Sequence, residues 1–218
     1  MGHLGTQAQN RLEFWTKLNS SFTISPRLSM AVDMQFRTQA DYHNNSKNCF
    51  DHYKMQSVRP WLIYKTKSTA ELLLSPVAFF RTSDYLTNSN EWGHTDEIRA
   101  TVGIQKSVNN KKFALKWRLM LESRNFIYPV STHHYRARVQ VQMKIPLIKK
   151  AKTEVGVLLA EEYFYKLFEK MDNNRIFTGL SIAKKNYEIQ TGVQWQQLGN
   201  FTNGNPIFQF ANTINLKF

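Results

Sequence analysis

The sequence predicts an all-β fold, an antiparallel up-and-down transmembrane β-barrel whose polar lumen is rich in arginine and glutamate. Three observations support this fold. Apolar and polar residues alternate along most of the chain, the polar positions carry many Arg and Glu residues, and short connections alternate with longer ones. A soluble β-sandwich also shows alternation, so the charged face has to decide between the two folds.

The length and hydropathy of the chain fit a single barrel. Its 218 residues suit one domain, and no shift in composition divides them. The sequence has no run of about 18 uncharged apolar residues, which excludes a transmembrane helix. Membrane-spanning strands are not excluded, because only every second residue of a barrel strand faces lipid.

The strands are predicted from alternation with a period of two, which helical spacing cannot produce. The clearest cases lie between Leu28 and Arg37 and between Tyr135 and Ile145. The same pattern recurs in segments 97–105, 113–122, 175–182 and 187–196. Weaker alternation adds segments 12–22, 55–64, 70–81, 155–164 and 207–218, which makes about eleven strands. Short connections are expected at 23–26, 66–68, 107–110 and 184–186, and long ones at 38–52, 82–91 and 126–132.

The number of strands conflicts with the usual parity of bacterial barrels, which normally have an even number. We therefore expect about twelve strands, with about ten as the alternative. Residues 1–9 are expected to form a separate N-terminal segment, either the end of a secretory signal, an extra short strand or an ordinary polar terminus. Residues 10–218 would then form the single barrel domain.

The two faces of the predicted strands differ sharply in chemistry. One face is apolar and is expected to contact lipid or a partner protein through Met30, Val32, Val102, Val139, Val141, Met143 and Ile189. The other face is expected to form a charge network in the lumen from Glu97, Arg99, Arg118, Glu122, Arg124, Arg136, Arg138, Glu162, Arg175 and Glu188. A closed lumen can hold such charges in pairs, whereas a water-exposed sandwich face has no need for Arg in every strand.

The last predicted strand ends in a feature that resembles an assembly signal. Phe208, Phe210, Ile214, Leu216 and Phe218 share one face, and Phe218 stands at the C-terminus. A terminal aromatic residue on the lipid face resembles the signal that outer-membrane assembly machinery recognises. This residue favours a location in the outer membrane of a Gram-negative bacterium.

Several stretches together resemble a known family. They are Phe14–Thr16, Gln35–Arg37, Asp96–Arg99, Trp117–Arg124, Tyr135–Arg138, Glu161–Phe164 and Asp172–Leu180. In these stretches the chain resembles the outer-membrane barrel family known as domain of unknown function 2490, common in Bacteroidetes-type Gram-negative bacteria. The resemblance implies a barrel but no activity, because the family's function is uncharacterised. The chain departs from the family pattern at the pair Glu161 and Glu162, where an Asn-Glu pair is more usual.

Enzymatic and nucleic-acid-binding functions have little support in the sequence. The net charge of +13 is spread along the chain rather than gathered in one patch with stacking aromatic residues, so no nucleic-acid partner is expected. The sequence contains no G-x-S-x-G, H-E-x-x-H or P-loop motif and no Cys/His metal spacing, so we expect no enzyme, metal or cofactor. The alternative is a lipid-modifying enzyme, a lipase or acyltransferase, and its test is whether a serine and a histidine converge at the barrel rim. The residues to inspect are Ser131, His43, His52, His94, His133 and His134.

The sequence therefore predicts an integral outer-membrane barrel. Its role would be that of a structural or accessory subunit of an envelope complex, or of a narrow pore. Two readings of the lumen charges remain open: a plug that fills a narrow barrel, and a selectivity lining for anionic solutes. The expected partners are outer-membrane lipids and other outer-membrane or periplasmic proteins.

Overall fold

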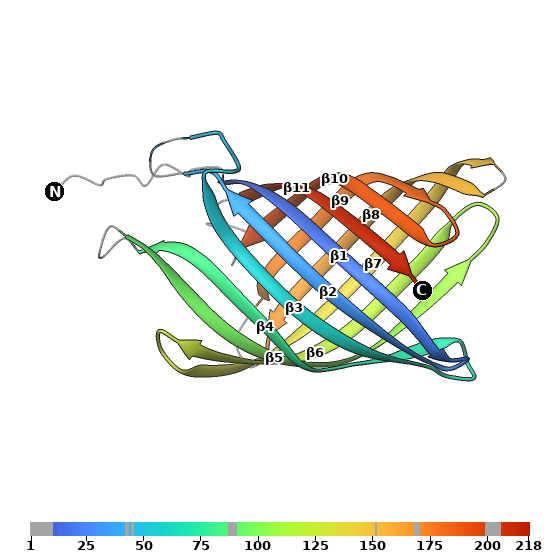
Figure 1. Cartoon of the computed structure of the whole chain (residues 1–218), viewed down its shortest axis with the longest axis horizontal. Helices are drawn as coiled ribbons and strands as arrows, with labels where there is room; N and C mark the ends of the chain where they lie inside the picture. Colours follow the sequence, from blue (N-terminus) through green and yellow to red (C-terminus); the bar gives the residue numbers. More distant parts are fainter. Residues whose placement is uncertain are drawn as a thin grey trace.

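The computed structural model describes residues 11–41, 44, 46–86, 91–150, 152–167, 171–198 and 206–218. Within this part the chain forms eleven β-strands that close into a barrel (Figure 1). The strands are β1 (Arg11–Ser25), β2 (Leu28–Gln39), β3 (His52–Lys65), β4 (Ala70–Leu86), β5 (Glu91–Asn109), β6 (Ala114–Tyr128), β7 (Thr132–Lys150), β8 (Thr153–Lys166), β9 (Met171–Ala183), β10 (Tyr187–Leu198) and β11 (Pro206–Lys217). The described residues contain no helix long and apolar enough to cross a membrane. The predicted N-terminal segment 1–9 and His43 lie outside the described residues.

Strands that follow each other in the chain pair antiparallel, and the barrel closes through a parallel pair. β1 lies beside β11 in a parallel register that runs from Arg11 opposite Ile207 to Ser21 opposite Lys217. An odd number of strands requires this arrangement, because the first and last strands then point the same way. The expectation of twelve strands, or ten, is wrong: the described barrel has eleven and leaves no open edge for another. The error came from applying the even-number rule to a sequence whose own pattern indicated eleven.

The connections are shorter than the sequence suggested. β4 has 17 residues and continues to Leu86, and β5 has 19 residues and begins at Glu91, so most of the segment 82–91 is strand. β6 likewise reaches Tyr128 and β7 begins at Thr132, although 126–132 was expected to be a long connection. Alternation is lost in these segments, but the backbone ladder continues, because its hydrogen bonds do not depend on an apolar face.

The first residue of β1 and the last residue of β11 lie at opposite ends of the barrel, because the two strands run parallel (Figure 1). β1 begins at the end where β2 ends and β3 begins, whereas β11 ends beside the short turn between β1 and β2. Phe218 is fixed there: its backbone N–H donates to the carbonyl oxygen of Ser21 at 2.9 Å, and its ring stacks on Phe22 with centroids 5.0 Å apart. The C-terminal residue therefore helps to close the wall.

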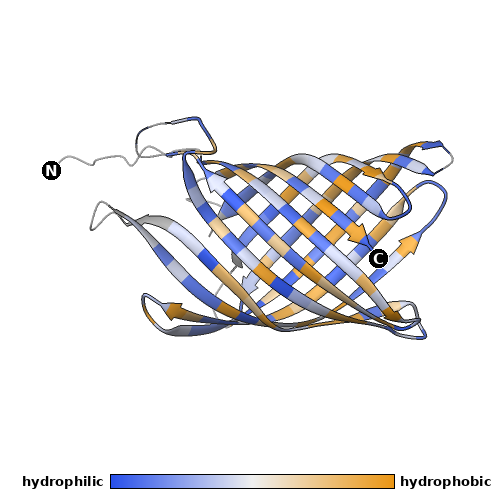
Figure 2. Ribbon diagram, viewed as in Figure 1, coloured by the Kyte–Doolittle hydropathy of each residue, from blue (hydrophilic) through white to orange (hydrophobic). Residues whose placement is uncertain are grey.

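The distribution of side chains is reversed relative to a soluble protein. Hydrophilic and hydrophobic residues alternate along the strands that cross the barrel wall in Figure 2. Most large apolar side chains point outward and are exposed, among them Val102 at 51% and Phe79 at 58%. The interior holds buried charged and amide side chains together with a small apolar cluster of Ala31, Trp61, Leu73 and Met120. The outer wall is therefore largely apolar and the interior largely polar.

Candidate functional site

The candidate site is the set of charged side chains inside the barrel. Ionic contacts join eight of the ten predicted lumen residues to one another or to Arg59. We call these nine residues the lumen network: Arg59, Glu97, Arg99, Glu122, Arg124, Arg136, Arg138, Glu162 and Arg175. It is organised around the three carboxylates, which come from β5, β6 and β8.

Glu97 forms the centre of the first cluster of the network. Arg124 on β6 binds both of its carboxylate oxygens, with Nε 2.6 Å from Oε1 and Nη2 2.8 Å from Oε2. Arg99, two residues along β5 and therefore on the same face, binds the same carboxylate through Nε and Nη2. Both arginine side chains are 12% exposed and Glu97 is 4% exposed. Two-point binding of this kind fixes geometry as well as charge.

Glu122 is the most deeply buried carboxylate of the network. The residue is 1% exposed, and Arg136 on the neighbouring strand β7 donates to its Oε2 from both Nε at 2.9 Å and Nη2 at 2.5 Å. Its other oxygen lies 3.5 Å from Nη2 of Arg59 and 3.6 Å from Nη1 of Arg138. One carboxylate thus faces three guanidinium groups from two separate parts of the wall, β3 and β7.

Glu162 completes the network on β8. Arg138 donates to its Oε1 from Nε and also reaches Glu122, so this arginine bridges two of the three carboxylates. Nη1 of Arg175 on β9 lies 3.7 Å from the other oxygen of Glu162. The strand register brings these groups together. Arg175 stands directly opposite Glu162 on β9, and Arg138 lies two residues from Gln140, which stands opposite Glu162 on β7.

Aromatic rings occupy the space between the charged groups. The guanidinium of Arg99 lies 3.6 Å from the ring centroid of Phe80, and that of Arg59 lies 5.1 Å from it. Phe164, only 1% exposed, lies within 4.5–5.1 Å of three guanidinium groups, those of Arg136, Arg138 and Arg175. A ring face attracts a guanidinium and also excludes water. Arginine, glutamate and phenylalanine side chains therefore contact one another inside the barrel.

Two predicted lumen residues stand apart from this network. Arg118 donates through Nε to the side-chain oxygen of Gln105 at 2.8 Å. Glu188 accepts from Nζ of Lys144 at 3.0 Å, and this lysine also lies 3.1 Å from Glu154. Both contacts lie toward the short turns. There they continue the polar lining of the lumen.

Sequence reasoning missed several interior residues. Arg59, Phe80, Phe164 and Trp15 contribute to the interior, and Nε1 of Trp61 donates to Asp33 at 3.1 Å. The alternation of inward and outward residues along a strand could have found Asp33 and Arg37, because both lie on the polar face of β2. It could not find Phe80 and Phe164, because an apolar residue that points inward looks like a fault in the alternation.

The residues predicted to face lipid or a partner all lie on the outer wall. Met30, Val102, Val139, Val141 and Ile189 are between 41% and 51% exposed. Val32 and Met143 lie on the same faces of β2 and β7 and are half-buried. Whether lipid or protein covers them stays a prediction.

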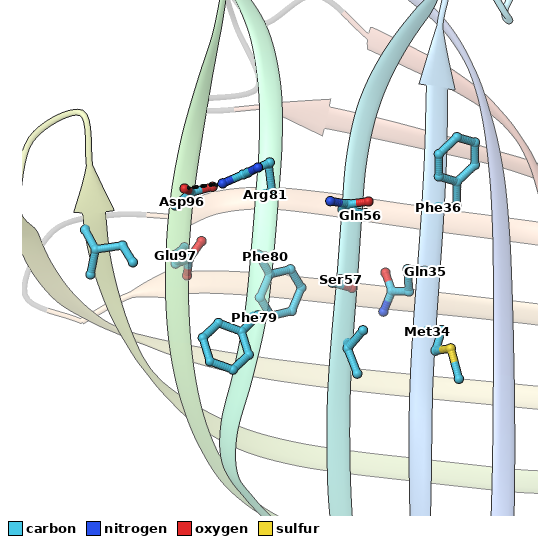
Figure 3. A pocket seen from close by; sticks show the side chains of 12 residues that line it. Met34, Gln35, Phe36, Gln56, Ser57, Phe79, Phe80, Arg81, Asp96 and Glu97 are labelled. Atoms are coloured by element: carbon cyan, nitrogen blue, oxygen red, sulfur yellow. Dashed lines mark hydrogen bonds and ion pairs between the residues drawn. The ribbon is translucent and has the colours of Figure 1, made fainter.

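The outer wall also contains a groove of about 450 Å³ across β2–β5 (Figure 3). Met34, Phe36 and Phe79 supply exposed apolar side chains to it. One edge is polar: Nε of Arg81 donates to Asp96 Oδ1 at 2.7 Å and Nη2 donates to Oδ2 at 2.8 Å. The groove therefore has an apolar part, formed by Met34, Phe36 and Phe79, and a charged edge, formed by Arg81 and Asp96.

The histidines that the sequence singled out occupy different places. His52 stacks on Trp92 with ring centroids 4.2 Å apart, and His94 stacks on Tyr128 at 4.5 Å. His134 points inward and stacks on Phe126, whereas His133 points outward and lies beside Ser123, not Ser131. The described residues include no group of three side chains placed to hold a metal ion.

Comparison with known proteins supports the family rather than an activity. No curated protein matches the chain. The family model described as "Protein of unknown function (DUF2490)" matches residues 12–206, which includes every charged residue of the lumen network. The chain therefore belongs to the DUF2490 family of proteins of unknown function.

Proposed function

We propose that this protein is an integral barrel of the outer membrane, closed inside by its own side chains, that acts as a structural or accessory subunit of an envelope complex. The observation that carries the proposal is the reversed distribution of side chains. Exposed Val102, Leu121, Val141 and Ile189 lie outside, while Glu97 and Glu122 are buried inside. Water on both sides would leave the outer wall unfavourably solvated.

The dimensions of the strands agree with a membrane location. A strand needs about 9–11 residues to cross the hydrocarbon core at the usual tilt. The shortest strands, such as β2 and β11, have 12 residues, and β5 and β7 have 19. Every strand is therefore long enough to cross, and the longest would extend beyond the bilayer.

The lumen network supports a closed interior rather than an open pore. Its charges are arranged in ion pairs, and the rings of Phe164 and Phe80 lie against the guanidinium groups. Moving an anion through would require these contacts to separate, and breaking a buried ion pair costs about 3–5 kcal/mol. A narrow anion-selective pore is the alternative, and conductance distinguishes the two.

The location that we propose is the outer membrane of a Gram-negative bacterium of the Bacteroidetes type. Lipids would cover most of the apolar wall, and other outer-membrane or periplasmic proteins would be the partners of an accessory subunit. The apolar groove across β2–β5 offers one place for such contact.

The proposal is tested by membrane insertion followed by conductance. The full chain, folded into phospholipid vesicles, is expected to resist extraction by alkaline carbonate and to migrate faster on a gel when unheated. In planar bilayers it should remain silent, while Phe164→Ala should admit ions because it removes the ring between three arginines. A chain that remains soluble without detergent would refute the membrane location. Steady conductance by the unaltered protein would refute the closed lumen.

A further inference from the structure

The outer face of the β6–β7 hairpin brings a serine and a histidine together. Oγ of Ser123 lies 3.1 Å from Nε2 of His133, within hydrogen-bond distance. The two residues are ten positions apart in the sequence, and the hairpin register places Ser123 opposite Tyr135 and Asn125 opposite His133. Both Ser123 and His133 share the outward parity of Leu119 and Leu121.

The imidazole of His133 is held in place from one side. Its ring meets that of Tyr135 edge-on, with centroids 4.5 Å apart and planes at 89°. Because Nε2 faces Ser123, Nδ1 is the ring nitrogen left for a second partner. Asn125 has outward parity and stands directly opposite His133, and side chains so paired have Cβ atoms about 4.5–5.5 Å apart. An amide oxygen at this position can accept from Nδ1 and fix the tautomer.

The pair lies at the border of the apolar wall. Toward the short turns, the outward rows continue through Leu121 and Leu119 on β6 and through Val139 and Val141 on β7, all between 44% and 50% exposed. Exposed tyrosines lie near the pair: Tyr135 stands opposite Ser123, and Tyr165 and Tyr163 on β8 stand opposite Ala137 and Val139, the next outward positions along β7. Aromatic girdles mark the boundary between hydrocarbon and headgroups. In a membrane this level is also where the ester bonds of lipids lie.

We infer that Ser123 and His133 form a catalytic pair that cleaves ester-linked acyl lipids at the membrane boundary. This inference rests on the proposed membrane location and adds an activity to it. The hydroxyl of Ser123 within hydrogen-bond reach of the imidazole is the first part of an activated nucleophile, and we assign the orienting role to Asn125 from its place opposite His133. It reverses the expectation that the chain is not an enzyme, because motif searches read neighbouring residues and this pair is assembled by strand register.

The reaction follows from the geometry. Oγ of Ser123 attacks the carbonyl carbon of the lipid ester while Nε2 of His133 takes the hydroxyl proton. The bond from that carbon to the alcohol oxygen breaks, and His133 returns the proton to the departing alcohol. The acyl group then remains as an ester on Ser123. Water, deprotonated by His133, attacks this ester and releases the fatty acid, and the proton returns to Ser123.

The test uses the full chain inserted in vesicles and an alkyl fluorophosphonate, which labels activated serines. The adduct is expected on the peptide that contains Ser123, and vesicles of diacyl phospholipid should release fatty acid while dialkyl ether-lipid vesicles release none. Ser123→Ala and His133→Ala should each lower fatty-acid release by at least about 100-fold, the usual contribution of a general base. Ser131→Ala and His94→Ala are the matched controls and should retain both labelling and release.

Asn125 is a positioning residue, so its variant needs a different readout. Asn125→Ala should lower kcat for a soluble ester while KM stays unchanged, and Asn125→Asp should restore part of the loss by accepting from the same ring nitrogen. An inserted barrel that gives no adduct on Ser123, or equal hydrolysis after Ser123→Ala, would overturn the inference. Failure of insertion would instead refute the proposed membrane barrel, so the two failures are distinguishable.

Discussion

Replacing the buried carboxylate of Glu122 gives the most direct measure of what the lumen network contributes to stability. Glu122→Gln keeps the size of the side chain but removes the charge that faces Arg136, Arg59 and Arg138. Removing one partner of a buried ion pair costs about 3–5 kcal/mol, because the remaining charges are left uncompensated. Three guanidinium groups share this carboxylate, so we expect a loss in the upper half of that range, about 4–5 kcal/mol.

The assay is urea unfolding of the barrel folded in detergent or vesicles, followed by tryptophan fluorescence and by mobility of the unheated protein on a gel. Glu154→Gln is the control, because this carboxylate is 30% exposed and pairs with Lys144 and Lys149 near the short turns. Exposed pairs contribute about 0–1 kcal/mol, so the control should unfold close to the unaltered protein. A loss below about 1 kcal/mol for Glu122→Gln would show that water, not arginine, compensates the charge in the lumen, and the plugged interior would be refuted.

Four further outcomes follow from the same structure. Val141→Arg, at an outward position, should cost about 2–4 kcal/mol in vesicles if the bilayer midplane covers it, while Gln142→Arg on the inner face of the same strand serves as the comparison. Gly192→Val should destabilise the barrel by about 1–3 kcal/mol in the same urea assay, because a Cβ there would lie 2.2 Å from the carbonyl oxygen of Thr178 and must push β9 away. Phe164→Ala should cost about 3–5 kcal/mol in addition to opening the lumen. In the connection 46–51, hydrogen bonds from Ser46 and from the Asp41 amide lower the pKa of Asp51, so its stabilising contribution is present above the ordinary carboxyl pKa and is lost as pH falls through the lowered value. The protection of amides in this connection, relative to the intrinsic exchange rate at each pH, should therefore fall in acid, and Asp51→Asn should remove this change.

Much of the fold could be predicted from the sequence because barrel walls have only two faces. The alternation in β2 and β7 assigned Met30 and Val141 to the outer wall, and the same period placed Glu122 and Arg136 inside. Strand number was the weak point. Alternation indicated eleven strands, from which the parallel pairing of β1 and β11 follows, but the even-number rule replaced that count.

The sequence could predict which residues form the candidate site but not which of their side chains contact one another. The alternation shows that Glu122, Arg136 and Arg138 point inward. It cannot show that Arg59 on β3, three strands from β6 in chain order, reaches the carboxylate of Glu122 across the interior. Contacts across a lumen depend on the shear and diameter of the closed barrel. The Ser123 and His133 pair was hidden for a related reason: its formation depends on the register of one hairpin, which the spacing of the two residues does not reveal.

The parallel pairing of β1 and β11 determines which strand pair of the barrel forms last during folding. Asn19 and Asn215, hydrogen-bonded across it, are 196 residues apart in sequence, whereas every other junction joins neighbouring segments. Ten antiparallel junctions can thus form progressively as hairpins, but the eleventh has to wait until the last strand is available. Until then both free edges remain able to capture another chain. A folding helper would be most valuable at this final step.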